Sequence, residues 1–302
     1  MTPRWRGMVA PLLLLLLGQA CPQVAQALPG ELGSNWTTGM ELNLSGRFNP
    51  VGASVGGRAT VRRRLFHEDH VLRKTGLGNV LLAPSAVGLA VTADTSPAYV
   101  RAGVGLEFMP AAVWRMRLTW QATQTFGNFG FLMKFEDRTD PYGPIHRVFR
   151  GRVPGAMQAR LVQRLMAENL FQVKLWRIIL FNLTNVELGR VGPGGGWFYN
   201  GEYDLLVRGA WDVVGRNVFL AAVSVLDGKS MPELAVGGFH MVAASVWSRG
   251  VTMQAGAAVV VGPPVRGIIP RSASWIILAG FHLWDRHRQS TPYLVWLMSL
   301  AF

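Results

Sequence analysis

Residues 293–302 read YLVWLMSLAF, and this closing stretch decides the fold. Every second residue, counted back from the end, is large and apolar: Phe302, Leu300, Met298, Trp296 and Leu294. Successive side chains of a β-strand point to opposite faces, so these five share one face. The other face carries Tyr293, Val295, Leu297, Ser299 and Ala301. One face of this predicted strand therefore suits an apolar solvent.

A chain that ends on such a strand, with an aromatic last residue, resembles Gram-negative outer-membrane β-barrel proteins. In that class the terminal Phe is part of the signal read by the insertion machinery, so the resemblance gives Phe302, Leu300 and Trp296 this role. It also implies the outer membrane as location, with its lipid, lipopolysaccharide and the barrel-insertion machinery as partners. The runs at residues 63–66, 96–99 and 106–110 are similar to barrel proteins of this class that have no assigned function.

Residues 1–27 have the features of a cleaved secretory signal peptide. Arg4 and Arg6 make a short basic start, residues 8–17 are apolar, and Ala25-Gln26-Ala27 is a small-x-small cleavage site. The apolar run is shorter than the roughly 20 residues of a membrane-spanning helix. An uncleaved anchor and a lipid attached at Cys21 are the alternatives. We expect export, a periplasmic segment at residues 28–38 and a barrel at residues 39–302.

The composition supports an all-β membrane protein. No apolar stretch of about 18 residues follows the signal, which argues against membrane-spanning helices. Cleavage would remove Cys21, the only cysteine, so the mature chain could form no disulfide bond. A soluble β-sandwich also shows alternating strands, but the large apolar residues on one face and the short spacing between strands favour a closed antiparallel transmembrane barrel.

Period-two alternation recurs along the chain and predicts about fourteen strands, within a range of about 12 to 16. The clearest are residues 40–48, 98–108 and 114–123, of which the last two form a hairpin around Pro110. The others are residues 58–66, 80–93, 129–135, 156–168, 171–183, 198–208, 217–226, 234–247, 251–261, 274–284 and the closing strand. Counting back from the end places the long connections, 136–155 and 186–197, on the periplasmic side. Short turns belong there, so either one strand is miscounted or the barrel is unusual.

The polar face of the early strands is rich in basic residues, which should line the lumen. They are Arg47, Arg58, Arg62, Arg64, Arg101, Arg115, Arg117, Arg160, Arg164 and Lys174. Acids in the same phase are few, mainly Glu41, Glu107, Glu202 and Asp204. A ring of guanidinium groups around a water path would enrich anions and repel cations. The alternative is that these arginines pair with the acids and fill the barrel.

The later strands differ, because residues 235–247, 251–261 and 274–283 are apolar or small on both faces. We expect them to pack inside the lumen, for example against residues 136–155 or 28–38. An apolar track for a substrate is the alternative. The seam between the closing strand and the first strands should therefore join an apolar wall to a basic one.

Three functions follow from these patterns. The first is a passive channel for small solutes that prefers anions. The second is a non-conducting barrel whose filled interior supports outer loops used for adhesion or assembly. The third is a lipid-modifying enzyme built on His240 or His282 with Ser245 or Ser274. Because no His-x-Ser pattern marks these residues, we expect no enzyme and assign no catalytic residue.

No cofactor or metal site is predicted. The cluster His67-Glu68-Asp69-His70 has metal-ligand spacing, but we interpret it as a polar loop between strands. The glycine-rich residues 192–196 lack the lysine and the following helix of a phosphate-binding loop. The arginines are spread over inward strand positions, not gathered on one helix, so we expect no nucleic-acid partner.

Overall fold

The computed structural model describes residues 35–48, 52–66, 70, 81–82, 84–127, 132–138, 159–191, 195–226, 233–262, 272–285 and 290–301. The predicted signal peptide and most of residues 28–38 lie outside the described residues. So do Cys21, Phe302, most of the cluster at residues 67–70 and most of the connection at residues 136–155. No helix among the described residues is long and apolar enough to cross a membrane.

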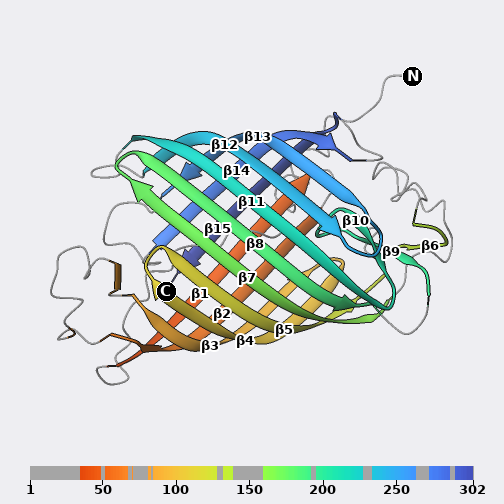
Figure 1. Cartoon of the computed structure of the whole chain (residues 1–302), viewed down its shortest axis with the longest axis horizontal. Helices are drawn as coiled ribbons and strands as arrows, with labels where there is room; N and C mark the ends of the chain where they lie inside the picture. Colours follow the sequence, from red (N-terminus) through yellow and green to blue (C-terminus); the bar gives the residue numbers. More distant parts are fainter. Residues whose placement is uncertain are drawn as a thin grey trace.

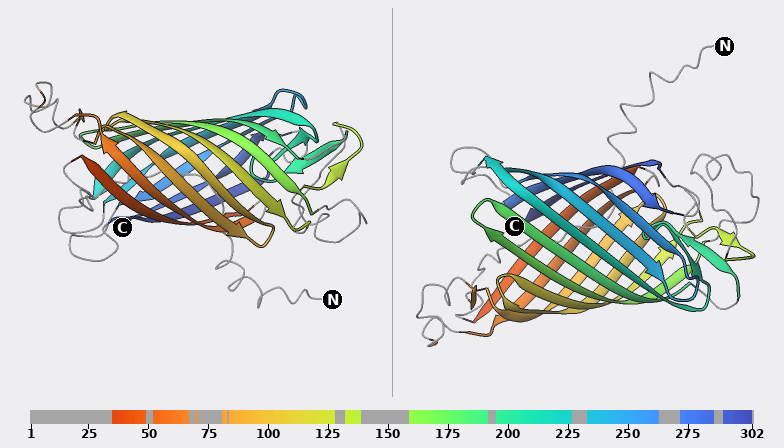
Figure 2. Two further views of the ribbon diagram at one scale, coloured as in Figure 1. Left: turned by 90° about the horizontal axis from the view of Figure 1, so that it is seen from below. Right: turned by 45° about the horizontal axis from the view of Figure 1, so that its top comes forward.

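The chain folds into a closed antiparallel barrel of 12 strands (Figures 1 and 2). In chain order they are β1 (Trp36–Phe48), β2 (Gly52–Arg64), β3 (Ala86–Ser96), β4 (Tyr99–Ala111), β5 (Trp114–Thr125), β7 (Leu161–Leu175), β8 (Ile178–Arg190), β11 (Trp211–Leu226), β12 (Leu234–Ser245), β13 (Val251–Val261), β14 (Ser272–Trp284) and β15 (Pro292–Ala301). β15 closes the barrel by pairing with β1, with Leu300 opposite Leu42. The predicted fold class is therefore confirmed, with fewer strands than the fourteen expected.

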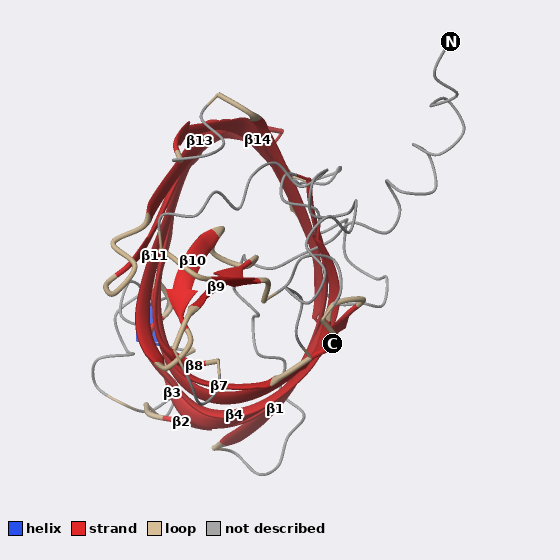
Figure 3. Ribbon diagram, turned by 90° about the vertical axis from the view of Figure 1, so that its right-hand side faces the viewer, coloured by secondary structure: helices blue, strands red, loops and turns tan. Residues whose placement is uncertain are grey.

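Three short strands form a second sheet that is not part of the wall. They are β6 (Lys134–Phe135), β9 (Trp197–Asn200) and β10 (Leu205–Arg208), in the order β10-β9-β6. A view along the barrel shows β9 and β10 within the outline of the wall (Figure 3). We call β9, β10 and their turn at residues 201–204 the lumen hairpin. The predicted wall strands at residues 129–135 and 198–208 were wrong, because β6, β9 and β10 belong to this second sheet.

The absence of residues 198–208 from the wall changes the end of the barrel at which the long connections lie. With residues 198–208 removed from the wall, residues 126–160 and 191–210 both join strands at the end of the barrel that carries the small sheet. β15 finishes at the opposite end (Figure 1). The expectation that the long connections share the end at which β15 finishes was wrong, because one miscounted strand reverses the side of every earlier loop.

Several strand boundaries also differ from the prediction, among them those of β7 and β8. β7 and β8 join through a tight turn at Trp176 and Arg177, whereas the sequence pattern placed the break near Asn169. Asn169 lies within β7, and its Oδ1 accepts a hydrogen bond from Trp114 Nε1 over 2.6 Å. A polar residue on an apolar face looked like a turn because the sequence does not show that its amide is bonded across strands.

The outer surface of the wall is mostly apolar. Leu89, Val91 and Val104 are 65%, 59% and 54% exposed, although their neighbours on the inner face are largely buried. A polar cluster lies on this surface on β8 and β11, where Asn217 Nδ2 donates to Thr184 Oγ1 over 2.8 Å. Because these groups bond to each other, the cost of placing them beside lipid is reduced.

The barrel is oval in cross-section, and β13 and β14 form its narrow end (Figure 3). Gly256 of β13 lies opposite Gly280 of β14. A Cβ atom added to Gly256 would lie 2.1 Å from the carbonyl oxygen of Ala279, and one added to Gly280 would lie 2.1 Å from that of Ala255. Only glycine permits such an approach, so this pair lets the wall bend sharply.

The narrow end brings apolar inner faces together. Leu220, Leu278 and Val295 belong to one buried cluster, formed by strands from β7 to β15. The rings of Phe239 and Tyr293 lie 6.2 Å apart within it. The later strands therefore pack against one another at this end of the lumen. The segments expected to pack there, residues 136–155 and 28–38, lie mostly outside the described residues, so that expectation stays a prediction.

Candidate functional site

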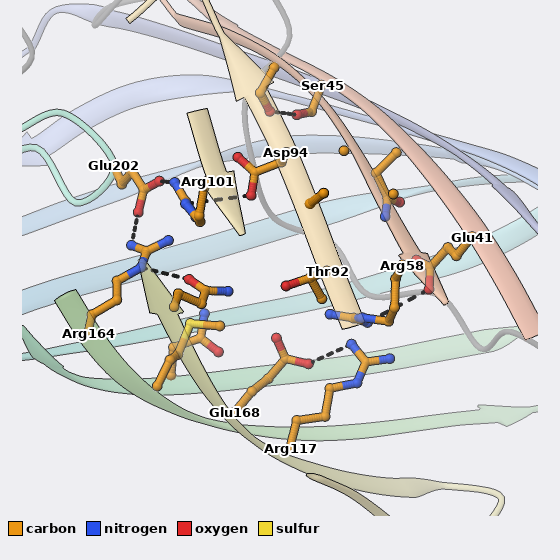
Figure 4. A pocket seen from close by; sticks show the side chains of 18 of the residues that line it. Glu41, Ser45, Arg58, Thr92, Asp94, Arg101, Arg117, Arg164, Glu168 and Glu202 are labelled. Atoms are coloured by element: carbon orange, nitrogen blue, oxygen red, sulfur yellow. Dashed lines mark hydrogen bonds and ion pairs between the residues drawn. The ribbon is translucent and has the colours of Figure 1, made fainter. Parts of the chain in front are cut away.

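The tip of the lumen hairpin crosses the barrel and binds the arginine-rich wall. Glu202 forms ion pairs with Arg101 of β4 and with Arg164 of β7, one through each carboxylate oxygen (Figure 4). Arg47 of β1 donates to the carbonyl oxygen of Gly201, and to that of Glu202 over 3.3 Å. We call Arg101, Arg164 and Glu202 the latch, because they join the hairpin tip to this wall.

The other side of the hairpin packs against the apolar wall. Phe198, Leu205 and Val207 are buried in one cluster with Val214 of β11 and Ala243 of β12. On β13, Thr252 Oγ1 donates to the carbonyl oxygen of Tyr203 over 3.4 Å. The hairpin is thus anchored on one wall by apolar contacts and held to the opposite wall by charged side chains.

Tyr203, next to the latch, connects the tip to two further strands. Its hydroxyl donates to Glu187 Oε2 of β8 over 2.7 Å, and the Arg216 guanidinium of β11 lies 5.2 Å from its ring centre. Burial raises the pKa of Tyr203 well above its ordinary value, and the nearby Glu187 carboxylate raises it further. The phenol therefore stays neutral and remains a hydrogen-bond donor.

Inward arginines of β2 and β5 are paired with acids. Glu107 accepts from Arg62 Nε over 2.5 Å and from Arg117 Nε over 2.6 Å, and Arg117 also donates to Glu168 over 3.0 Å. Arg58 lies 3.8 Å from Glu41. A carboxylate that faces two guanidinium groups offsets the repulsion between them, which allows both to be buried.

The buried charges balance within the described part of the chain. Six arginines are buried there: Arg62, Arg101, Arg115, Arg117, Arg164 and Arg216. Six acids are buried as well: Glu41, Glu107, Glu187, Asp204, Asp212 and Asp285. The interior is therefore much closer to neutral than the inward arginines alone suggest.

Two cavities have the latch residues in their lining. The larger, about 150 Å³, is lined mainly by early strands, with Arg216 of β11 and Leu297 of β15, and Glu202 and Tyr203 contribute to its lining from the hairpin (Figure 4). The smaller, about 30 Å³, is lined by Asn200 and Val207 of the hairpin and by adjacent wall residues. Arg101, Arg164 and Glu202 line both cavities. The latch thus forms part of the walls of two spaces inside one barrel.

The structure brings most of the predicted lumen residues to the inner side of the wall. Arg58, Arg62, Arg101, Arg115, Arg117 and Arg164 lie there among acids, Arg47 reaches the hairpin, and Arg64 ends β2 in the same phase. Arg160 lies 5.1 Å from the ring centre of Phe198 in the hairpin. Lys174 differs, because it is near the end of β7, 45% exposed and paired with Glu233. On β15, Leu300 and Trp296 lie on the outer face, as the period-two pattern predicts.

Sequence reasoning missed Glu187, Tyr203 and Arg216. Arg216 was excluded because β11 was predicted to begin one residue after it, whereas the strand begins at Trp211. Tyr203 was assigned to a wall strand. Its position between Glu202 and Asp204 in a short polar segment was the available signal for a turn.

The two histidines considered for an enzyme do not meet. His240 pairs across strands with Phe219, which is 43% exposed, so it lies on the outer side of the wall. His282 is fully buried on the inner side, near Gln254 and Asp204. The two histidines therefore lie on opposite faces of the wall, and Ser245 donates its hydroxyl to Asp212.

Comparisons with known proteins give only distant similarities. No family model matches the chain, and no curated protein matches it. Among solved structures, LpxR from Salmonella typhimurium is 7% identical with a TM-score of 0.36, covering 87% of this chain and 99% of that one. An outer membrane channel from Pseudomonas putida F1 is 9% identical with a TM-score of 0.37, covering 94% and 100%. CdiB from Acinetobacter baumannii is 6% identical with a TM-score of 0.32, covering 88% and 60%. At these values the similarities assign neither a family nor an activity.

Proposed function

We propose that this protein is a bacterial outer-membrane channel whose lumen is closed by the lumen hairpin in the state described. Its outer surface is apolar, as lipid requires, and the closed barrel leaves no free sheet edge in the membrane. The predicted signal peptide and the closing strand fit export to that membrane. Small solutes are the proposed cargo.

The observation that carries this proposal is the position of the latch. Arg101, Arg164 and Glu202 line the cavity of about 150 Å³ and also the cavity of about 30 Å³. Separation of Glu202 from the two arginines would join these spaces. The position of the Glu202 side chain therefore determines whether the two cavities are connected.

The two sides of the hairpin favour movement over a permanent plug. On the anchored side, Phe198 and Leu205 are 1% exposed and pack against wall residues. On the latched side, the contacts are ion pairs and hydrogen bonds, and Tyr203 is the one residue of the turn at 201–204 that also belongs to the apolar cluster. The tip can then move away from the arginine-rich wall while β9 and β10 remain packed against the apolar wall.

The opened path would favour anions weakly. Five arginines line the larger cavity: Arg58, Arg101, Arg117, Arg164 and Arg216. Four carboxylates face them: Glu41, Asp94, Glu168 and Glu202. Because the excess is a single positive charge, we expect a modest preference for chloride over potassium and not strict selectivity.

Planar-bilayer recording of the purified, refolded protein tests the proposal. The wild-type protein should be mostly silent, and Glu202→Gln should give discrete conductance steps, because a neutral amide holds two guanidinium groups far less strongly than a carboxylate. The control is Glu233→Gln, which removes the partner of Lys174 but leaves the latch intact. This control should be as silent as the wild type.

Two further measurements complete this test. In a potassium chloride gradient, the reversal potential of Glu202→Gln should favour chloride, because the loss of Glu202 leaves five arginines against three carboxylates in the lining. A wild-type protein that conducts as readily as Glu202→Gln would show that the hairpin does not close the lumen. Folded Glu202→Gln that remains silent would reject gating at the latch and favour a non-conducting barrel that supports outer loops.

A further inference from the structure

Three potential metal ligands meet where the anchored side of the hairpin contacts β14. They are Asp204 in the hairpin turn, His282 in β14 and Asp285 directly after it, and all three are buried. One ligand atom from each lies within 4.8 Å of the other two. This cluster of ligands is distinct from the latch, because the cluster lies on the side of the hairpin that faces the apolar wall.

The spacing of these atoms suits ligands of a shared ion. His282 Nδ1 lies 3.8 Å from Asp204 Oδ2 and 4.0 Å from Asp285 Oδ2. Both distances exceed the length of a hydrogen bond. Two ligand atoms that are each about 2.1 Å from one metal ion are roughly 3.4 to 4.2 Å apart, depending on geometry.

A fourth polar side chain points to the same place. Gln254 of β13 is 4% exposed, and its Nε2 lies 3.3 Å from His282 Nδ1. Its Oε1 is buried without a hydrogen-bond partner. Rotation of the amide by half a turn exchanges the two atoms and directs the oxygen, a suitable metal ligand, toward His282.

The local backbone and a neighbouring side chain hold Asp204 in position. Asp204 has a φ of 59°, a left-handed conformation that is uncommon for a residue other than glycine. Tyr199 donates its hydroxyl to Asp204 Oδ1 over 2.6 Å, and Asp204 Oδ2 faces His282. Such a bond to the second oxygen is typical of carboxylates that bind metals.

We propose that Asp204, His282 and Asp285, with Gln254 Oε1, bind one divalent transition-metal ion. An imidazole combined with carboxylates suits ions such as Zn²⁺ or Mn²⁺ better than Ca²⁺ or Mg²⁺, which prefer oxygen ligands alone. The ion would join the hairpin turn to the barrel wall at β14. Its regulatory consequence, a more firmly anchored hairpin, rests on the proposed gating function, whereas the site itself does not.

Metal binding is measured directly, with protein that carries no histidine tag. The protein is refolded, stripped with EDTA, given Zn²⁺ or Mn²⁺, desalted and analysed for bound metal by mass spectrometry. We expect about one ion per wild-type chain and a higher unfolding temperature with the ion than without it. His282→Gln should lose most of the bound metal and most of this thermal shift.

The matched control is His240→Gln, because His240 is the histidine on the outer side of the wall and should not contribute. Asp285→Asn lies outside the hairpin and serves if His282→Gln does not fold. A stripped wild-type chain that takes up neither ion overturns the proposal, as does equal uptake by the wild type and the folded site variants. Conductance is recorded separately, so loss of metal binding leaves the latch test unaffected, and a silent Glu202→Gln leaves the metal result unaffected.

Discussion

Tyr203 donates its hydroxyl to Glu187 over 2.7 Å and so ties the tip of the lumen hairpin to β8. Replacing Tyr203 with Phe removes this bond but keeps the ring beside Arg216. We expect a loss of about 1.5 to 3 kcal/mol in the free energy that holds the tip closed, because a buried hydrogen bond to a charged group contributes roughly that amount. Bilayer recording should show more frequent openings than in the wild type, but fewer than in Glu202→Gln.

Thr252→Val provides the comparison for this prediction. Thr252 bonds the main chain of the same residue, Tyr203, but from the anchored side and over a longer distance of 3.4 Å. This variant should stay as silent as the wild type. Equal opening by Thr252→Val and Tyr203→Phe would mean that hydrogen bonds on the latched and anchored sides contribute equally to keeping the tip closed.

Glu107→Gln should destabilise the barrel strongly. Glu107 is 2% exposed and faces Arg62 and Arg117. A neutral amide would leave buried positive charge uncompensated, at a cost of about 3 to 5 kcal/mol. Urea unfolding, followed by tryptophan fluorescence, checks this. Glu136→Gln is the control, because its side chain is 92% exposed, and it should unfold at the wild-type urea concentration.

The alternation of the sequence predicted most of the wall and both of its faces. On β15, for example, Tyr293, Val295 and Leu297 are buried, whereas the residues between them are partly exposed. This succeeds because lipid and lumen impose opposite demands on neighbouring residues of one strand. The arginine-rich early wall and the apolar later wall were visible for the same reason.

The closure of the lumen could not be predicted in this way. Leu205, Leu206 and Val207 are all buried, because β10 is surrounded inside the barrel and has no lipid-facing side. Their run is compatible with a wall strand, so the hairpin was counted as part of the wall. The pairing of Glu202 with Arg101 and Arg164 depends on that hairpin turning inward, and no local pattern encodes the contact.

Substitution of Val91 by Arg tests which surface faces lipid. Val91 is in the middle of β3 and is 59% exposed. An arginine on the lipid face near the middle of the membrane costs about 2 to 4 kcal/mol. Trp176→Arg is the control, because Trp176 is 85% exposed in the turn between β7 and β8. Refolding titrations in lipid vesicles should show a large loss for Val91→Arg and a small one for Trp176→Arg.

Gly256→Ala tests whether the narrow end of the barrel depends on close contact between β13 and β14. The new Cβ atom would lie 2.1 Å from the carbonyl oxygen of Ala279, which is main chain and cannot turn aside. The strands must separate, and we expect a loss of about 3 kcal/mol or more and a poor yield of the folded, heat-modifiable band on gels. Gly215→Ala on β11 is the control, because its Cβ atom would meet nothing within 4 Å. That variant should fold as well as the wild type or slightly better, since alanine has less freedom to lose in a strand. Normal folding of Gly256→Ala would show that the sharp bend does not require glycine at this position.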